Sequence, residues 1–117
     1  MKTLENTIKK NGFTYKLHKR EDDLAIYEQW DYDNPDKPIL IAYEVFIVKI
    51  TKDFEIKGKQ ITGGERFPRN EDFGYTAWTY STFGNILSLY PYTQYKNAKE
   101  LAYNKFEYLK NRENLEE

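Results

Sequence analysis

The sequence of 117 residues contains no cysteine and a single histidine, His18. The absence of cysteine excludes a disulfide framework and every thiolate zinc site, and it is typical of proteins of a reducing cytoplasm. With one histidine and no cysteine, nucleophilic triads of the Ser-His or Cys-His type have almost no support. We therefore expect a cytoplasmic protein that is not an enzyme and that needs no metal or cofactor.

Long hydrophobic runs and an excess of one charge are also lacking. The longest apolar-rich segment, residues 39–50, contains Glu44 and Lys49 and is far too short for a membrane helix. The first residues are polar and contain no hydrophobic region of signal-peptide length. Charged residues make up 32% of the chain, but their signs nearly cancel to a net charge of −1. This balance argues against nucleic-acid binding over the whole surface, although it allows a local basic patch.

Aromatic residues are abundant, at 17% of the chain, with 11 Tyr and 7 Phe. The core must therefore depend on rings, and tyrosine suits half-buried sheets and interfaces equally well because its polar tip needs a partner. The length fits one domain spanning residues 1–117, which is large enough to bury a core without stabilisation by disulfides or metal ions.

Alternation of apolar and polar residues predicts a series of strands. They cover residues 13–17, 24–30, 39–51, 54–61 and 75–80. The first two form a hairpin around a polar turn. Residues 39–51 are apolar on both faces and belong in the middle of a sheet. The 54–61 segment holds a strand or a hairpin around Gly58.

Helical patterns occur at both ends of the sequence. Residues 3–11 predict a short helix, with Thr3 as N-cap, Leu4 and Ile8 on one face and Gly12 after its end. Near the other end a clearer helix follows Thr93 or Asn97, either of which can act as its N-cap. Its apolar positions at helical spacing are Tyr95, Ala98, Leu101, Ala102, Phe106 and Leu109. We expect an α+β fold: an antiparallel sheet of four to five strands, the C-terminal helix on one face, and the short N-terminal helix.

Two polar features favour structural interpretations over chemical ones. His18 alternates with Leu17, so it is interpreted as a solvent-exposed strand histidine rather than a general base. The acidic cluster Asp31, Asp33 and Asp36 fails the EF-hand pattern and is interpreted as a turn. The wider acidic run over residues 21–36 indicates a solvated face or, alternatively, a mimic of nucleic-acid phosphates.

Basic residues form two groups. The groups are Lys2, Lys9, Lys10, Lys16, Lys19 and Arg20, then Lys49, Lys52, Lys57, Lys59, Arg66 and Arg69. We expect a long loop from Gly63 to Gly74 as the binding surface, because such loops tend to be functional or disordered. Its contact residues would be Arg66 and Arg69, with Phe67 as an apolar anchor; the neighbouring Lys57 and Lys59 complete the binding residues. In the alternative interpretation, the two arginines pair with Glu65, Glu71 and Asp72.

The stretch Asn-Glu-Asp-Phe-Gly-Tyr-Thr-Ala-Trp-Thr-Tyr over residues 70–80 is followed by the helical pattern that contains Ala98 and Phe106. Over residues 43–109 this layout resembles small proteins encoded by phages and integrated elements. An abundance of Lys, Asn, Ile, Tyr and Phe is in keeping with an AT-rich bacterial or phage genome. The resemblance implies a non-enzymatic binding protein, such as an anti-CRISPR-type inhibitor of an RNA-guided nuclease in bacterial defence, with a host protein or protein–RNA complex as its partner.

Two other functions stay open. A single-stranded RNA- or DNA-binding module would use the basic and aromatic residues between Lys49 and Tyr75, although aromatic residues at alternating positions are more often core. A small enzyme would have to use carboxylates and tyrosines alone, with Glu28, Glu44 or Asp72 as candidates.

Overall fold

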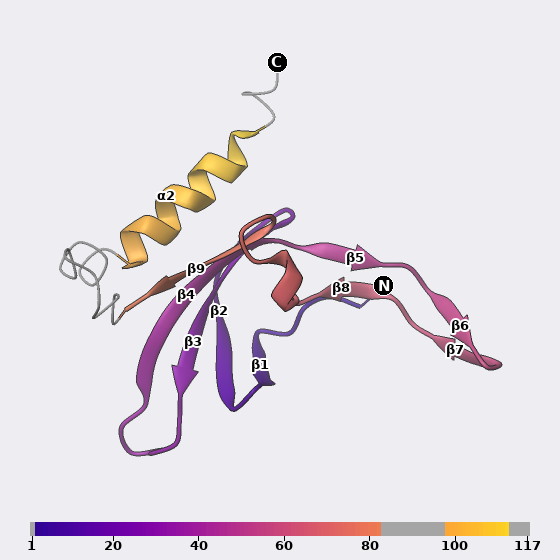
Figure 1. Ribbon diagram of the computed structural model, residues 1–117, viewed down its shortest axis with the longest axis horizontal. Helices are drawn as coiled ribbons and strands as arrows, with labels where there is room; N and C mark the ends of the chain where they lie inside the picture. Colours follow the sequence, from indigo (N-terminus) through magenta and orange to yellow (C-terminus); the bar gives the residue numbers. More distant parts are fainter. Residues whose placement is uncertain (1, 83–97, 113–117) are drawn as a thin grey trace.

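The computed structural model describes residues 2–82 and 98–112, and its central element is a five-stranded antiparallel sheet (Figure 1). The strand order is β1-β2-β3-β4-β9. The strands are β1 (Thr7–Lys10), β2 (Phe13–Glu21), β3 (Leu24–Asp31), β4 (Ile39–Ile47) and β9 (Ala77–Ser81). The hairpin of β2 and β3 confirms the sequence prediction, and the last strand begins two residues later than expected.

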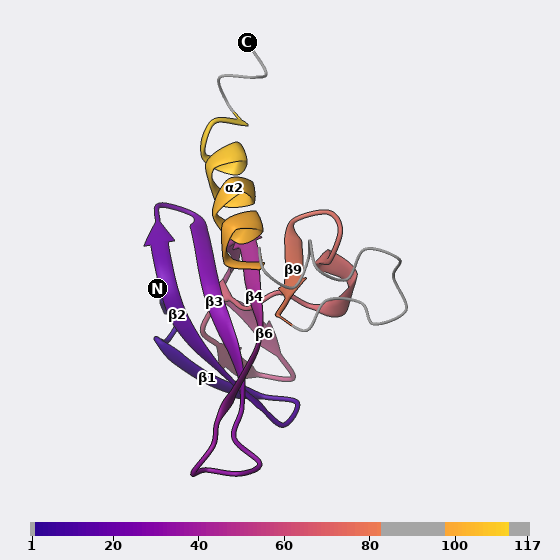
Figure 2. The same cartoon turned by 90° about the vertical axis from the view of Figure 1, so that its left-hand side faces the viewer.

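Helix α2 (Ala98–Lys110) crosses one face of this sheet, as Figures 1 and 2 show. Four of its predicted apolar positions are buried, namely Ala98, Ala102, Phe106 and Leu109. Leu101 is 36% exposed, and Tyr95 lies outside the described residues. The four buried side chains pack against Leu24, Ile26, Tyr43 and Val45 of the sheet. The predicted C-terminal helix is therefore confirmed. Its proposed N-caps, Thr93 and Asn97, lie outside the described residues. Within residues 2–82 and 98–112, no helix has the length and apolar character needed to cross a bilayer.

A second core lies on the opposite face of the sheet. Its buried members are Tyr15, Ala25, Tyr27, Phe46, Val48 and Ala77. Phe67 and Phe73, from the segment between the arm and β9, pack against them. Both faces of β4 are thus covered, as its apolar sequence predicts. The central strand by order is nevertheless β3, since β4 lies between β3 and β9.

After β4 the chain leaves the sheet and forms a long two-stranded ribbon, which projects from the body in Figure 1. Its strands are β5 (Lys49–Thr51), β6 (Phe54–Ile56), β7 (Lys59–Ile61) and β8 (Gly64–Arg66); β5 pairs with β8, and β6 with β7. We call residues 49–66 the arm. Its tip is a two-residue turn in which Lys57 and Gly58 have φ angles of 51° and 78°, the pattern of a type I′ hairpin. The hairpin predicted around Gly58 is confirmed.

The expected long loop from Gly63 to Gly74 contains secondary structure, so that prediction is wrong. Strand β8 and the short 3₁₀ helix η1 (Asn70–Asp72) occupy half of it. Gly63 and Gly64 allow this arrangement because they carry no side chain. A Cβ on Gly63 would lie only 2.0 Å from the carbonyl oxygen of Thr51 on the facing strand. The two glycines therefore mark close strand packing rather than a free loop.

The predicted N-terminal helix is also wrong, because residues 7–10 form the edge strand β1. Asn11 and Gly12 have φ angles of 55° and 84°, and they connect Lys10 directly to its partner Phe13. Both positive φ angles belong to a type I′ hairpin turn, for which Asn-Gly is the strongest short sequence signal. Gly12 therefore does not end a helix. It is instead the second residue of a turn.

Phe106 is fully buried between α2 and the sheet, so its truncation tests this packing. We expect Phe106→Ala to lower the free energy of unfolding by about 3 to 5 kcal/mol, the usual cost of deleting a buried ring. Tyr108→Ala, on the exposed side of the same helix, is the matched control and should cost within about 0.5 kcal/mol. Urea denaturation measures both values. A loss below about 1 kcal/mol for Phe106→Ala would mean that the helix does not pack as described.

Candidate functional site

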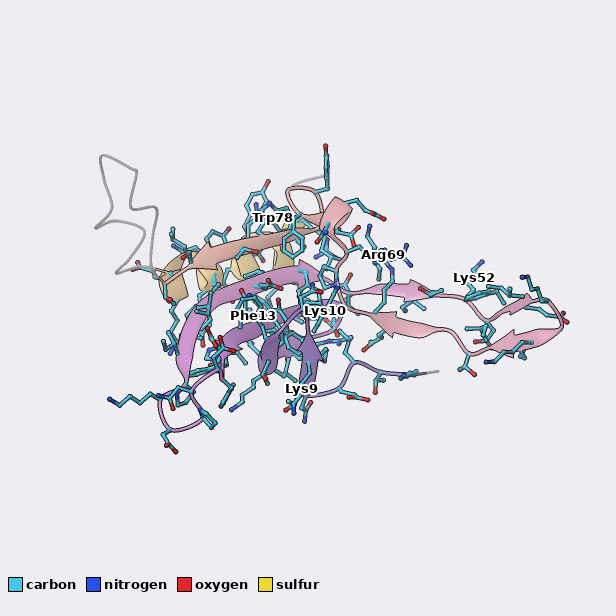
Figure 3. All side chains as sticks on the ribbon, turned by 60° about the horizontal axis from the view of Figure 1, so that its bottom comes forward. Lys9, Lys10, Phe13, Lys52, Arg69 and Trp78 are labelled. Carbon is cyan, nitrogen blue, oxygen red and sulfur yellow. The ribbon has the colours of Figure 1, made fainter. Side chains whose placement is uncertain are left out.

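Members of the two basic groups of the sequence meet at the base of the arm: Lys2 and Lys10 from the first, and Arg66 and Arg69 from the second. Lys2 forms a parallel bridge with Gly64, and its carbonyl oxygen accepts a hydrogen bond of 2.8 Å from the backbone N–H of Glu65. Lys10 on β1 donates from its Nζ to the carbonyl oxygen of Pro68 at 3.2 Å. In Figure 3, Lys10 and Arg69 lie where the arm joins the body, with Lys52 farther along it. The fold thus brings the N-terminal cations beside those of residues 49–69.

A hollow of about 410 Å³ lies between these segments. Its wall is formed by Lys2, Lys10, Thr51, Thr62, Gly63, Gly64, Glu65, Arg66, Phe67 and Arg69. Four of these residues are cationic and one is acidic. We call this feature the hollow.

The buried carboxylate of Asp72 binds several of the nearby basic groups. Its oxygens accept hydrogen bonds from Lys49 Nζ at 2.9 Å, from Arg66 Nη1 at 3.1 Å and from the backbone N–H of Arg69 at 2.9 Å. These donors, led by the Arg69 backbone N–H, hold the pKa of Asp72 well below its usual range. Arg66 and Lys49 are therefore partly neutralised.

Glu65 is bound from the body of the protein rather than from the arm. Arg20 donates to its two carboxylate oxygens at 3.0 and 2.6 Å, and the backbone N–H of Leu4 donates at 3.0 Å. The Arg20 hydrogen bond is the main cause of the lowered pKa of Glu65. The alternative sequence interpretation is thus right about Asp72 as a partner of Arg66, and wrong about Glu65.

Arg69 is an exposed cation of the hollow. Its side chain is 62% exposed, and its Nη1 lies 3.9 Å from Glu71 Oε1, at the outer limit of an ion pair. Lys57 and Lys59 lie at the far end of the arm, where both are exposed. The structure therefore gathers Arg66, Phe67 and Arg69 around the hollow and places the other two predicted binding residues on the arm tip.

Phe67 contributes mainly to the second core. Its ring centroid lies 4.9 Å from that of Tyr15, 5.1 Å from Phe46 and 5.5 Å from Tyr27. Lys10 Nζ lies 5.4 Å from the same centroid, within the range of a cation–π contact. Phe67 thus fixes the segment after the arm to the sheet and supports Lys10 at the hollow.

Glu44 is a buried carboxyl on β4, on the same face as Phe46. The residue is 5% exposed, and its Oε2 has no hydrogen-bond partner among the described residues. Burial raises its pKa to about 7, against a smaller opposing effect of Lys10. Burial, with a contribution from Glu44, also raises the pKa of Tyr15 to about 12. An acid in this environment changes its charge near neutral pH.

His18 is not the solvent-exposed histidine that the sequence predicts. Its side chain is 18% exposed, with Nδ1 2.8 Å from Glu28 Oε2 and Nε2 2.6 Å from the hydroxyl of Tyr103 on α2. The face opposite Leu17 is covered by the helix, which strand alternation alone does not reveal. His18 therefore joins the sheet to the helix on the side away from the second core.

The acidic cluster between β3 and β4 forms the expected turn. The backbone N–H of Asp33 donates to Asp31 Oδ1 at 2.8 Å, and that of Asp36 donates to Asn34 Oδ1 at 3.1 Å. These side chains cap the turn's own backbone. In the described part of the chain, no group of three or more His, Cys, Asp or Glu residues is placed to hold a metal ion.

No family model, curated protein or solved structure matches this chain.

The high pKa of Glu44 has a consequence for stability. The folded state holds this proton more tightly than the unfolded state, whose value is near 4.5, so stability is lost as pH rises through about 7. Glu44→Gln stays neutral and should avoid this loss. We expect the free energy of unfolding of the variant, relative to wild type, to rise by about 2 to 3 kcal/mol between pH 5 and pH 8.5. If urea denaturation gave wild type and Glu44→Gln the same dependence of stability on pH, the raised pKa of Glu44 would be contradicted.

Asp72 should make stability depend on pH in the opposite direction to Glu44, because its pKa is lowered from 3.8 in the folded state. We expect Asp72→Asn to lower the free energy of unfolding by about 2 kcal/mol at pH 7, since charge-assisted hydrogen bonds are lost. The difference should shrink as pH falls below about 4, because the unfolded wild-type chain then binds a proton at Asp72 while the folded chain keeps the carboxylate ionised. Glu71→Gln, at an exposed neighbouring position, is the control and should be nearly neutral. Equal stability of Asp72→Asn and Glu71→Gln at pH 7 would contradict the role of Asp72.

Proposed function

We propose that the chain is a non-enzymatic binding protein that binds single-stranded nucleic acid through the arm and the hollow at its base. The observation that carries this proposal is the convergence of Lys2 and Lys10 with Arg66 and Arg69, distant in sequence, at the base of an arm that exposes apolar side chains. Cationic grooves that bear aromatic platforms are the usual means of binding unpaired strands.

The arm offers both kinds of contact. Strand register places Phe54 opposite Ile61 and Ile56 opposite Lys59, so these four side chains share one face of the ribbon. Phe54 and Ile56 are 42% and 52% exposed. Lys52 and Lys57 are exposed on the same ribbon. Bases can stack on Phe54 while the lysines contact phosphates, and stacking contributes about 1 to 3 kcal/mol per base.

Unpaired strands fit this surface better than a long duplex. A two-stranded ribbon can enter a major groove, but base edges there are read by polar side chains. The face that holds Phe54 and Ile56 offers apolar area instead, which suits the exposed faces of unpaired bases. The overall charge of −1 and the acidic run over residues 21–36 also oppose contact with a long polyanion.

The chemistry of the hollow supports binding rather than catalysis. Its carboxylate, Glu65, is bound by Arg20, and Asp72 beside it is bound by Lys49 and Arg66. Carboxylates with lowered pKa and cationic partners are poor proton acceptors near neutral pH. The cations of the hollow whose side chains these carboxylates do not bind, Lys2, Lys10 and Arg69, are suited to neutralise charge on a ligand.

An inhibitor of an RNA-guided nuclease stays a prediction from the resemblance of residues 43–109 to phage proteins. Such a complex carries RNA, so the same surface would face its nucleic-acid component. The acidic run over residues 21–36 is the alternative contact, as a mimic of phosphates toward a basic protein.

The arm lysines give a direct test. We expect Lys57→Gln/Lys59→Gln to weaken binding of a fluorescent 12-nucleotide strand by about tenfold, measured by anisotropy. The slope of log K against log salt should also decrease by about 1.4, because each lost phosphate contact on a single strand removes about 0.7.

The matched control is Lys37→Gln/Lys99→Gln, which removes two exposed lysines from a loop and from α2. It changes net charge equally and should leave the salt slope unchanged. Equal slopes for wild type and both double variants would rule out the arm as the binding surface. Phe54→Ala should weaken binding without changing the slope, which separates stacking from charge.

A further inference from the structure

We propose that the hollow is a phosphate subsite, in which Lys2, Lys10 and Arg69 hold one phosphate group of the bound strand. This inference rests on the proposed function and assigns a ligand group to part of its surface. The phosphate has two possible sources, an internal phosphodiester or a terminal phosphate monoester, and the experiment below distinguishes them.

The backbone fixes the shape of the hollow. Gly63 and Gly64 are buried where β5, β8 and the N-terminal segment meet. A Cβ on Gly64 would lie 2.4 Å from the carbonyl oxygen of Lys2. Because no side chain fills this space, the N-terminal segment packs directly on β8 and Lys2 is held at the rim.

Positive charge in the wall exceeds negative charge. Arg66 is paired with Asp72, and Glu65 is paired with Arg20. Lys10 uses one of its three N–H donors on Pro68, while Lys2 has no side-chain partner among the described residues. The remaining cations, Lys2, Lys10 and Arg69, therefore face the hollow with donors to spare.

The number and type of these donors favour phosphate. The guanidinium of Arg69 offers a planar fork that can bind two phosphate oxygens, and each ammonium acts as a compact point charge. A single carboxylate carries one charge and two oxygens, fewer than these three cations can bind. A phosphate presents more oxygens, and the volume of about 410 Å³ also leaves room for the attached sugar.

The test uses pyrophosphate alone and one 12-nucleotide strand in three forms: with a 5′-phosphate, with a 3′-phosphate and with neither. Amide chemical shifts from NMR report the place of binding, and anisotropy reports affinity. In wild type, pyrophosphate should shift the amides of Thr62, Gly63 and Gly64. The variant Lys2→Gln/Lys10→Gln/Arg69→Gln should weaken pyrophosphate binding at least tenfold.

A second variant tests the subsite even if the triple variant does not fold. Thr62→Glu places a negative charge in the wall at an exposed position and leaves the three cations intact. It should also weaken pyrophosphate binding at least tenfold. Thr62→Gln, of similar size and without charge, is its control and should bind nearly as wild type does.

Preference of wild type for a strand with a terminal phosphate, lost in the triple variant, would support a monoester ligand. Equal binding of all three strands, weakened in the triple variant, would support an internal phosphodiester. Wild-type affinity of folded triple and Thr62→Glu variants for every probe would overturn the subsite, even if the arm variants still weakened strand binding. Binding of pyrophosphate at the hollow without binding of any strand would overturn the proposed function and leave the subsite standing.

Discussion

The carboxylate of Asp72 connects the arm to the body of the protein. It binds Lys49 on the first strand of the arm, Arg66 on the last, and the backbone N–H of Arg69 just after it. One buried charge thus joins both strands at the base of the ribbon to the 3₁₀ helix η1. Because buried charges are stable only when they are paired and hydrogen-bonded, these contacts form together. The position of Arg69 beside the hollow depends on them.

Most of the sheet and the C-terminal helix follow from the periodicity of apolar residues. The hairpin of β2 and β3, the doubly covered β4, the hairpin around Gly58 and the buried stripe of α2 are all foreseen in this way. The N-terminal helix is the main error. Leu4 and Ile8 fit a helical face, but Ile8 fits a strand face equally well, and the Asn11-Gly12 turn decides for the strand.

The candidate site is predicted only in part. Arg66 ends the arm and Arg69 follows it, and both line the hollow, but their segment is ordered by β8 and η1 and is not the expected loop. Lys2 and Lys10 could not be assigned to it, because they lie more than fifty residues away. Lys2 reaches it through its bridge to Gly64 of β8, and Lys10 through a hydrogen bond from edge strand β1 to Pro68. Tertiary contact of this kind has no local sequence signal. The sequence around Phe67 likewise does not indicate its three aromatic neighbours, which come together only in the folded second core.

The central claim is that single-stranded nucleic acid binds along the arm and at its base. The most direct measurement is NMR mapping of backbone amides during titration of the full chain with a 12-nucleotide strand. The account predicts shifts concentrated in residues 49–66, at Lys2 and around Arg69, with residues 98–110 of α2 unchanged. Shifts confined to α2 or to the acidic run over residues 21–36, or the absence of any shift at a strand concentration of about 1 mM, would contradict it.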